Sequence, residues 1–286
     1  MNGNLKIAIQ KKGRLGEKSL NLLRACGFEI ENYSERLFVS ANNFKLDVLF
    51  LRDDDIPEYV QDGVADIGIV GENVLIERNA EAEVIKKLGF GKCKLMIGIP
   101  EEENVSDIIA LNDKKIATSH PRLLNKFLNE NSLNSKVIEI SGSVEIAPSL
   151  GVADYICDIV STGNTLKFNK LKKSFSVFES EAVLIKSKDF NQTKQNLLNE
   201  FKARIDSVLF AKNSKYLMMN VARDSLDRIQ KIIPSLKSPT IVPLAEENLV
   251  AVHAVIPQEQ FWNIVSDLKS AGATGILLLP IENMIL

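Results

Sequence analysis

The chain has 286 residues, which corresponds to two domains, or three if one is small. Apolar residues make up 45% and charged residues 25%, a composition that is typical of globular proteins and excludes a chain disordered throughout. The 35 Lys and Arg residues are balanced by 37 Asp and Glu residues, and no basic block occurs. We therefore expect no nucleic-acid partner, whereas a pocket for a small anionic ligand needs only a few cations.

The three cysteines, Cys26, Cys93 and Cys157, are far apart and odd in number, which predicts reduced thiols. With only two histidines, His120 and His253, a histidine-based zinc site or catalytic triad is hard to assemble. Residues 1–10 form a strand pattern and no signal peptide, and the apolar runs are too short to cross a bilayer. We expect a cytoplasmic protein with no membrane partner.

Up to about residue 92, short apolar runs alternate with amphipathic stretches, which predicts an α/β lobe with a mostly parallel sheet. Asp55, as a capping acid, and Pro57 mark one helix start. The expected strands are residues 5–10, 36–40, 46–51 and 66–70, and the expected helices are 15–25, 55–63 and a further one opening after 71–73.

A second α/β block runs from about residue 94 to 186, with a helix that Ser119 caps and Pro121 begins. Its expected strands are residues 95–99, 115–117, 137–140 and 155–160. Two such lobes in tandem usually bind their ligand in the cleft between them, at the carboxyl ends of strands.

After a helix over about 193–211, the pattern predicts strand, helix, two strands, helix and strand within about 70 residues. The expected limits are 216–221, 224–232, 240–244, 250–256, 257–269 and 275–279. This βαββαβ order is that of the ferredoxin-like unit, which is often a small-molecule sensor in metabolic enzymes.

The segment most suggestive of chemistry is a strand over 155–160 that runs into Ser-Thr-Gly-Asn-Thr at 161–165 and opens a helix. Consecutive N–H groups at a helix start, a glycine and three hydroxyls favour phosphate binding. Asp158 would repel phosphate but can accept hydrogen bonds from sugar hydroxyls, so the pair predicts a ribose phosphate ligand. A simple hydroxyl-rich helix cap beside a solvated Asp158 is the alternative.

The spacing of Glu145, Gly151, Ala153, Asp158 and the following loop resembles the signature of the ATP phosphoribosyltransferase family. The resemblance covers nearly the whole chain. Its further segments are residues 10–15, 52–57, 66–73, 116–119, 238–240 and 278–281.

The resemblance implies a two-lobed catalytic core like type II periplasmic binding proteins, followed by an ACT-like, ferredoxin-like regulatory domain of the family's long form. Catalytic lobe I would comprise residues 1–92 and 188–213, and lobe II residues 93–187 with the loop for phosphoribosyl pyrophosphate (PRPP). The regulatory domain would be residues 214–286. The implied reaction joins N1 of ATP to C1 of PRPP and releases pyrophosphate, with Mg2+ bound through the diphosphate.

For PRPP, the resemblance implies that the loop holds the 5′-phosphate while Asp158, together with Glu145, faces the ribose hydroxyls. Family members commonly carry Ala or Arg in place of Asn164, so only a backbone contact is expected there. Glu145 as a capping acid after Ser143 is the competing interpretation. The expected phosphate-binding residues are Ser161, Thr162, Gly163, Asn164 and Thr165.

For ATP and the diphosphate, Arg14, Arg36 and Arg52 follow or flank neighbouring strands, and guanidinium groups bind phosphates with two hydrogen bonds. Lys11 is expected to assist them, and Gly71 and Glu72 to touch ATP, with a plain turn as the alternative. Arg52, Asp158 and Glu145 are the expected catalytic residues. The run 53–55 of three aspartates is either a metal ligand or, preferably, a helix cap.

In the C-terminal unit, the resemblance implies feedback inhibition by L-histidine. Asn220 stands where some members have an acid that pairs with the ligand's amine, so weaker binding is expected. A dimer or a hexamer is the implied assembly, without a synthetase-like regulatory subunit. The implied effector residues are Asn220, Leu236, Ser238, Thr240 and Ala273.

Two other classes compete with the enzyme. One is a solute-binding receptor, which the missing signal peptide disfavours. The other is a catalytically weak or non-catalytic regulatory relative that binds ligands in the same bilobal fold, against which the intact residues 158–165 argue.

Overall fold

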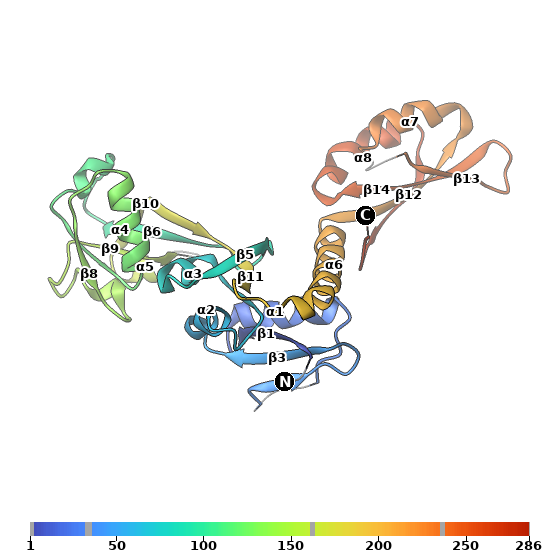
Figure 1. Cartoon of the computed structure of the whole chain (residues 1–286). Coiled ribbons are helices and arrows are strands. Elements are labelled where there is room, and N and C mark those ends of the chain that lie inside the picture. The colour runs from blue at the N-terminus through green and yellow to red at the C-terminus, as the bar shows by residue number, and fades with distance from the viewer. Residues whose placement is uncertain (1–2, 32–35, 161–163, 235–237, 286) are drawn as a thin grey trace. The chain divides into compact units, whose positions relative to one another are not determined.

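A computed structural model describes residues 3–31, 36–160, 164–234 and 238–285. In it, five strands from the first half of the chain share one sheet with a strand that comes much later in the sequence. By contacts the chain divides into two compact units, Met1–Asn21 with Glu29–Gln195, and Leu22–Phe28 with Asn196–Leu286. The caption of Figure 1 leaves the placement of the chain's parts open, so each unit is described by itself. In the described residues no helix is long and apolar enough to cross a membrane.

The first sheet of unit one has the order β2-β3-β1-β4-β11-β5. Strand β1 pairs in parallel with β3 and β4, whereas β11 is antiparallel to both of its neighbours. β4 is buried along its whole length, because helices cover both faces of a central parallel strand. The bounds are β1 Leu5–Gln10, β2 Phe38–Ser40, β3 Leu46–Leu51, β4 Ile67–Gly71, β5 Ala82–Lys87 and β11 Ala182–Ser187.

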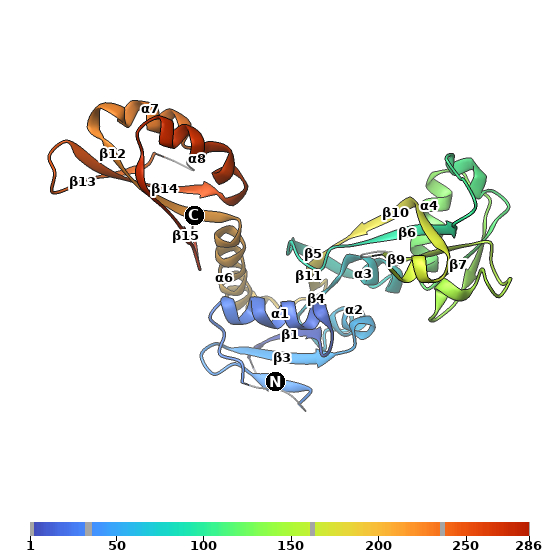
Figure 2. The same ribbon diagram turned by 180° about the vertical axis from the view of Figure 1, so that it is seen from behind.

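The second sheet of this unit has the order β10-β6-β9-β7-β8. β7 is parallel to β8 and β9, so the carboxyl ends of these three strands lie at one edge. Antiparallel β6 and β10 run side by side in both views, and Cys93 pairs with Ser180 where they meet the first lobe (Figures 1 and 2). The bounds are β6 Cys93–Pro100, β7 Lys115–Thr118, β8 Lys136–Glu139, β9 Tyr155–Val160 and β10 Leu171–Ser180.

The predicted boundary of the second lobe at residue 187 does not agree with the sheet to which residues 182–187 belong. Residues 182–187 were assigned to the second lobe without a predicted strand, but they form β11, whose backbone pairs with β4 and β5 of the first sheet. Strands β5 and β10 were not predicted, because charged residues break their apolar pattern: β5 reads AEVIKK and β10 reads LKKSFSVFES. The other predicted strands are present within two residues of their expected ends.

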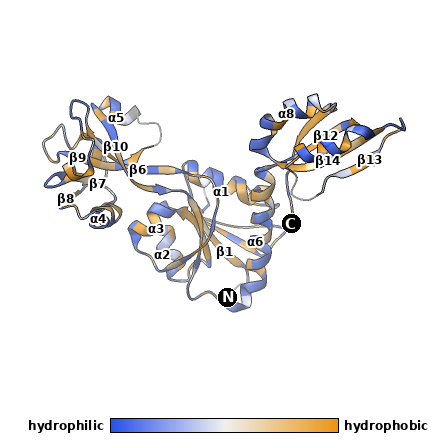
Figure 3. Ribbon diagram, turned by 90° about the horizontal axis from the view of Figure 1, so that it is seen from above, coloured by the Kyte–Doolittle hydropathy of each residue, from blue (hydrophilic) through white to orange (hydrophobic). Residues whose placement is uncertain are grey.

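Five α-helices accompany these sheets, and their apolar faces pack on apolar strands. Figure 3 shows the strands mostly in orange and the helices in alternating orange and blue, as amphipathic helices require. The bounds are α1 Arg14–Ala25, α2 Ile56–Gln61, α3 Glu72–Arg78, α4 Pro121–Glu130 and α5 Asn164–Phe168.

Unit two contains the predicted βαββαβ unit, whose sheet has the order β13-β14-β12-β15 with every neighbouring pair antiparallel. This confirms the ferredoxin-like topology. The bounds are α6 Gln195–Lys212, β12 Ser214–Ala222, α7 Leu226–Ile232, β13 Thr240–Pro243, β14 Leu249–Pro257, α8 Phe261–Ser270 and β15 Thr274–Pro280.

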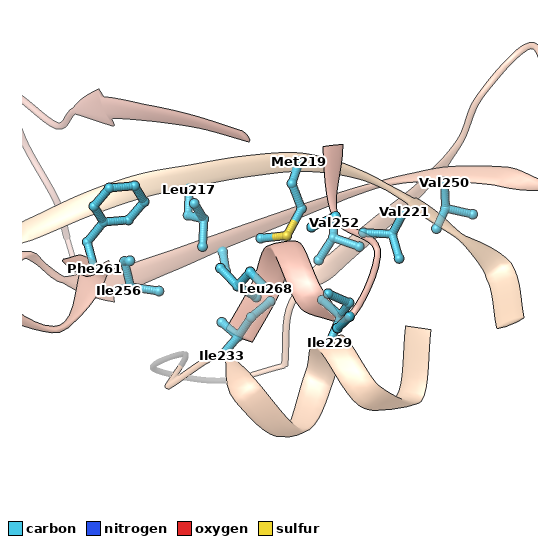
Figure 4. Close-up of a cluster of buried hydrophobic side chains, with 13 residues drawn as sticks. Leu217, Met219, Val221, Ile229, Ile233, Val250, Val252, Ile256, Phe261 and Leu268 are labelled. Carbon is cyan, nitrogen blue, oxygen red and sulfur yellow. The ribbon is translucent and has the colours of Figure 1, made fainter. Parts of the chain in front are cut away.

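One face of this sheet packs on α7 and α8 and forms the core of the unit (Figure 4). Leu217 and Met219 of β12 meet Ile229 and Leu268 of the helices there, all at 0% exposure. His253 of β14 is half-buried, and its Nδ1 lies 2.9 Å from the Tyr216 hydroxyl.

Candidate active site

The predicted cationic residues lie at the carboxyl edge of the first sheet. The Lys11 N–H donates to the Leu51 carbonyl at 2.8 Å, so the turns after β1 and β3 are adjacent, and Arg52 begins the second turn. Arg36 precedes β2, which runs antiparallel to β3 and brings it to the same edge. Arg14 begins α1, and all three arginine side chains are exposed.

Glycines hold the turn that carries Lys11 and Arg14. The Gln10 side-chain oxygen accepts from the Gly16 N–H at 3.1 Å. A Cβ at Gly16 would lie 2.2 Å from the Gln10 carbonyl oxygen, and Gly13 has a φ of +104°. Side chains do not fit either position, so the sequence Lys-Lys-Gly-Arg-Leu-Gly holds this turn in place.

Asp55 occupies the N-cap position of α2, as predicted for the aspartate run 53–55. In the described part of the chain its side chain makes no cap hydrogen bond, so the helix dipole is what favours the acid there, while Asp54 pairs with Arg78 at 2.9 Å. Asp53 has a buried Oδ1 with no hydrogen-bond partner among the described residues. Burial, and secondly the charge of Asp54, raises the pKa of Asp53 to about 6.

Gly71 and Glu72 lie where β4 enters α3, next to the strands that connect the lobes. The Glu72 N–H donates to the Glu181 carbonyl at 3.0 Å, and its carboxylate pairs with Lys87 at 3.1 Å. Asn73 is buried and bonds Ser180 twice: its N–H donates to the serine hydroxyl, and that hydroxyl donates to Asn73 Oδ1 at 2.8 Å. This turn is therefore more than a plain reversal of the chain.

Asp158 occupies the carboxyl half of β9, and Glu145 lies near it in a short 3-10 turn, Val144–Ile146. Burial raises the pKa of Asp158 and repulsion from Glu145 adds to this, while the Ile159 N–H and the His120 ring lower it. In the described structure Ser143, at the start of that turn, makes no side-chain cap bond, and Glu145 lies inside the turn and not at its cap. The structure therefore brings the two predicted carboxylates together.

The phosphate-binding loop falls partly outside the described residues, which exclude Ser161, Thr162 and Gly163. Helix α5 begins at Asn164, and Thr165 is exposed in its first turn. Leu166 is buried in the second lobe and anchors the helix there.

His120 is a functional candidate that the sequence did not suggest, because the helix cap was predicted at Ser119. His120 is itself the N-cap of α4 and is half-buried. It lines a pocket of about 790 Å³ with Ser119 and Ser141 at the strand ends of the second lobe, and with Asp54 and Arg78 of the first.

A second pocket, of about 550 Å³, lies where β6 and β10 leave the first lobe. Val160, the residue before the phosphate-binding loop, contributes to its wall. Its charged lining was not predicted, because the residues come from separate strands and have no common motif. They are Lys87, Lys92, Lys94 and Lys173 with Glu72, Glu179 and Glu181.

The predicted effector residues differ in accessibility. Asn220 is half-buried on β12, next to Gly275 of β15, where a Cβ would lie 3.5 Å from Asn220 Nδ2. Ser238 and Thr240 are exposed, whereas Ala273 is buried in the core, so a ligand would meet its backbone. Leu236 lies outside the described residues.

The three cysteines are free thiols in the described ranges, as predicted. Burial raises the pKa of Cys26 to about 12 and also raises that of Cys157, so neither thiol is a reactive thiolate.

A family model for ATP phosphoribosyltransferase matches residues 52–207, and a model described as HisG, C-terminal domain, matches residues 211–283. The chain is 48% identical over 285 residues to the ATP phosphoribosyltransferase of Cytophaga hutchinsonii, which covers 100% of both chains. It is 46% identical over 282 residues to that of Bacteroides fragilis, covering 99% of this chain and 100% of the relative.

Two solved structures agree with the fold. The ATP phosphoribosyl transferase (HisG:HisZ) complex from Thermotoga maritima matches with a TM-score of 0.60 and 28% identity, over 71% of this chain and 96% of that chain. A periplasmic sulfonate-binding protein from Methylobacillus flagellatus, 16% identical with a TM-score of 0.50, covers 70% of this chain and 66% of its own, and shares the fold alone. The family models, the full-length relatives and the two-lobed fold together place the chain in the ATP phosphoribosyltransferase family of glycosyltransferases.

Proposed function

We propose that the chain joins N1 of ATP to C1 of PRPP and releases pyrophosphate, the first step of histidine biosynthesis. One observation carries this proposal beyond family membership. Asp158, whose pKa burial and the charge of Glu145 raise, lies on the strand that runs directly into the hydroxyl-rich segment 161–165 and α5. Paired carboxylates next to a helix-opening loop suit a ribose that carries a 5′-phosphate.

The reaction forms a bond from N1 to C1 while the bond from C1 to the diphosphate oxygen breaks, with inversion at C1. Positive charge develops on the ribose ring, and negative charge on the leaving diphosphate. A side-chain nucleophile is not required. The protein has to align two anionic substrates and to complement these two charges.

Asp158 and Glu145 have the properties needed on the ribose side. Their carboxylates would accept hydrogen bonds from the ribose hydroxyls, and Asp158, half-buried, would stabilise the positive ring. Because desolvation and Glu145 already raise the pKa of Asp158, the empty site repels a further anion, and a cationic ring relieves this repulsion. The N–H groups and hydroxyls of residues 161–165 would hold the 5′-phosphate.

On the opposite lobe, Lys11, Arg14, Arg36 and Arg52 would bind the triphosphate of ATP and the departing diphosphate. They lie at one edge of the first sheet, and their exposure leaves the guanidinium groups accessible to ligand. Gly71 and Glu72 would contact ATP from the turn after β4.

Mg2+ fits this site as an ion held partly by substrate. Among the described residues no group of three or more His, Cys, Asp or Glu side chains could hold a metal, so a cage of protein ligands is not expected there. Magnesium is commonly bound by one or two carboxylates and substrate phosphates, and Asp158 with Glu145 would supply the carboxylates. When bound, the ion would neutralise charge on the leaving diphosphate.

Histidine would inhibit the enzyme by binding to the ferredoxin-like unit around Asn220, Ser238, Thr240 and the backbone of Ala273. An effector that binds outside the catalytic cleft acts by favouring one of two states of an assembly. We propose a homo-oligomer, a dimer or a hexamer, that needs no synthetase-like regulatory subunit because the chain carries its own C-terminal unit.

The test is to incubate the purified chain with ATP, PRPP and Mg2+ and to follow phosphoribosyl-ATP by absorbance, with and without histidine. Product that depends on both substrates is expected, and histidine should slow its formation. Binding of both substrates without product would instead favour a non-catalytic relative. If histidine did not change the rate of product formation, only the proposed inhibition by histidine would be wrong.

A further inference from the structure

Three backbone N–H groups at the start of α4 donate to side chains, and two of the three acceptor atoms come from the other lobe. Such donors have no partners within their own helix. The His120 N–H donates to Thr118 Oγ1 at 2.9 Å, and Pro121 has no N–H. The Arg122 and Leu123 N–H groups donate to the two carboxylate oxygens of Glu77, at 2.9 and 3.1 Å.

Glu77 belongs to α3 of the first lobe, so it caps a helix of the second lobe. The first turn of α4 contains no acidic residue of its own. A carboxylate at this position uses both oxygens and also complements the positive end of the helix dipole. The cap therefore forms only when the two lobes are in this relative arrangement.

A second bridge lies one turn earlier on α3. The Asn73 amide nitrogen is 3.4 Å from Nε2 of His120, whose Nδ1 is 3.0 Å from the Ser119 hydroxyl. Asn73 is also held by Ser180, on the strand that connects the lobes. His120 in turn lies near Asp158 and lowers its pKa. Polar contacts thus link α3 to His120 and Ser119 at the start of α4, and the charge of His120 acts on the Asp158 carboxyl.

We propose that Glu77 is a positioning residue, which holds the two lobes in the arrangement that binds both substrates. The inference rests on the proposed function, because ATP and PRPP there contact opposite lobes. If only a fraction of the molecules has the competent arrangement, the apparent affinity for both substrates falls by that fraction. Glu77 would increase this fraction without touching either substrate.

Amide hydrogen exchange tests the bridge without any substrate. In the unmodified chain, the Arg122 and Leu123 amides should exchange slowly, although first-turn amides normally exchange fast. Glu77→Ala should accelerate both by about fivefold to thirtyfold, the effect of losing a helix cap, and Glu77→Gln, which keeps one acceptor oxygen, should fall between. The control is Glu130→Ala at the other end of α4, where the side chain is exposed. Unchanged exchange in Glu77→Ala would overturn the proposal.

Steady-state kinetics then tests positioning. With the other substrate held well below its own KM, Glu77→Ala should raise KM for ATP and for PRPP by one common factor of roughly 3 to 30. The kcat at saturation with both substrates should stay within about twofold, because saturating substrates restore the competent arrangement. If Glu77 only supported the fold, its loss would lower kcat and leave KM unchanged. That result would overturn the proposal, and so would an unchanged KM for either substrate. If the unmodified chain makes no product, the proposed function is wrong. The hydrogen-exchange experiment still tests whether Glu77 bonds the Arg122 and Leu123 amides, because it needs no substrate.

Discussion

The charge of Glu145, in the short turn Val144–Ile146, raises the pKa of Asp158 on strand β9, although the two residues belong to different segments of the chain. Burial raises the pKa of Asp158 first, and the charge of Glu145 raises it further. Two carboxylates placed close together in a folded protein cost free energy, and such arrangements occur where a ligand with positive charge or hydroxyl donors compensates for it.

Asp158→Asn should remove most of the activity and leave the fold intact. An amide still accepts a hydrogen bond from a hydroxyl, but it no longer complements a cationic ring, so kcat should fall by roughly 10²-fold. Initial rates at saturating substrates measure this. Glu102→Gln, an exposed acid of the same lobe, is the matched control. Full activity of Asp158→Asn would assign that carboxylate a structural role.

Arg52→Ala should lower kcat/KM by about 10²-fold, because a guanidinium at the carboxyl end of β3 would bind the diphosphate. Arg52→Lys should recover only part of the loss, since an ammonium group lacks the planar two-pronged geometry. Arg228→Ala on α7, also exposed, should keep full activity. Equal rates for the Arg52 and Arg228 variants would exclude Arg52 from the site.

The free energy of unfolding should depend on pH through Asp53. Its pKa rises from 3.8 to about 6 on folding, so the folded state binds more protons than the unfolded state between these values. Stability then falls as the pH rises from about 4 through about 6, and levels off above.

Asp53→Asn removes this titration. At about pH 7.5 the free energy of unfolding of the variant should exceed that of the unmodified chain by about 1–2 kcal/mol, and this difference should shrink toward about pH 4. Urea denaturation at several pH values measures it, with exposed Asp227→Asn as the control. A difference that widens in acid contradicts the raised pKa.

Asn220→Asp should strengthen inhibition by histidine. Asn220 is half-buried on β12 beside Gly275 of β15, and a carboxylate there would pair with the amine of the effector. The concentration for half-inhibition should drop by about tenfold, as expected for a charge-assisted hydrogen bond, while kcat without histidine stays the same. Asn213→Asp, an exposed residue of the same unit, should change neither value. Weaker inhibition in Asn220→Asp would place the amine elsewhere.

Leu268→Ala should destabilise the ferredoxin-like unit by about 2–5 kcal/mol, because the Leu268 side chain is fully buried and its removal leaves a cavity. Thermal and urea unfolding measure the loss. Leu277→Ala is the comparison, since that leucine is 49% exposed on the open face. Equal effects of the two substitutions would mean that the core shown in Figure 4 is not the main support of this unit.

The sequence predicted the topology of the C-terminal unit and most strands of the lobes, because apolar periodicity reports directly on which residues are buried. It did not predict β11 in the first sheet, since Ala-Val-Leu-Ile is equally suited to any buried strand and only tertiary pairing decides which one. Strands β5 and β10 were not predicted, because strands at a sheet edge or between lobes need no apolar pattern.

At the site, the residues that could be predicted from the sequence are those whose own type and spacing suggest chemistry, such as Asp158 and Arg52. It missed those whose role depends on a neighbour from another lobe. Glu77 looks like a solvated residue on a helix, and His120 like a surface residue, until α3 and α4 are seen to meet. The aspartate run shows a different limit: Asp55 has the type and position of a cap, but the sequence did not predict the 3-10 turn Asp53–Asp55 before α2 or the missing cap hydrogen bond of the Asp55 side chain in the described structure.

The position of β11 between β4 and β5 has a consequence for how the chain folds during synthesis. β4 and β5 leave the ribosome early, but the strand that joins them emerges only after the whole second lobe. The second lobe can therefore complete its sheet first, while the first sheet remains in two pieces with open edges at β4 and β5. An unfinished edge of this kind invites wrong pairing, so the nascent first lobe is the part of the molecule most in need of chaperone protection.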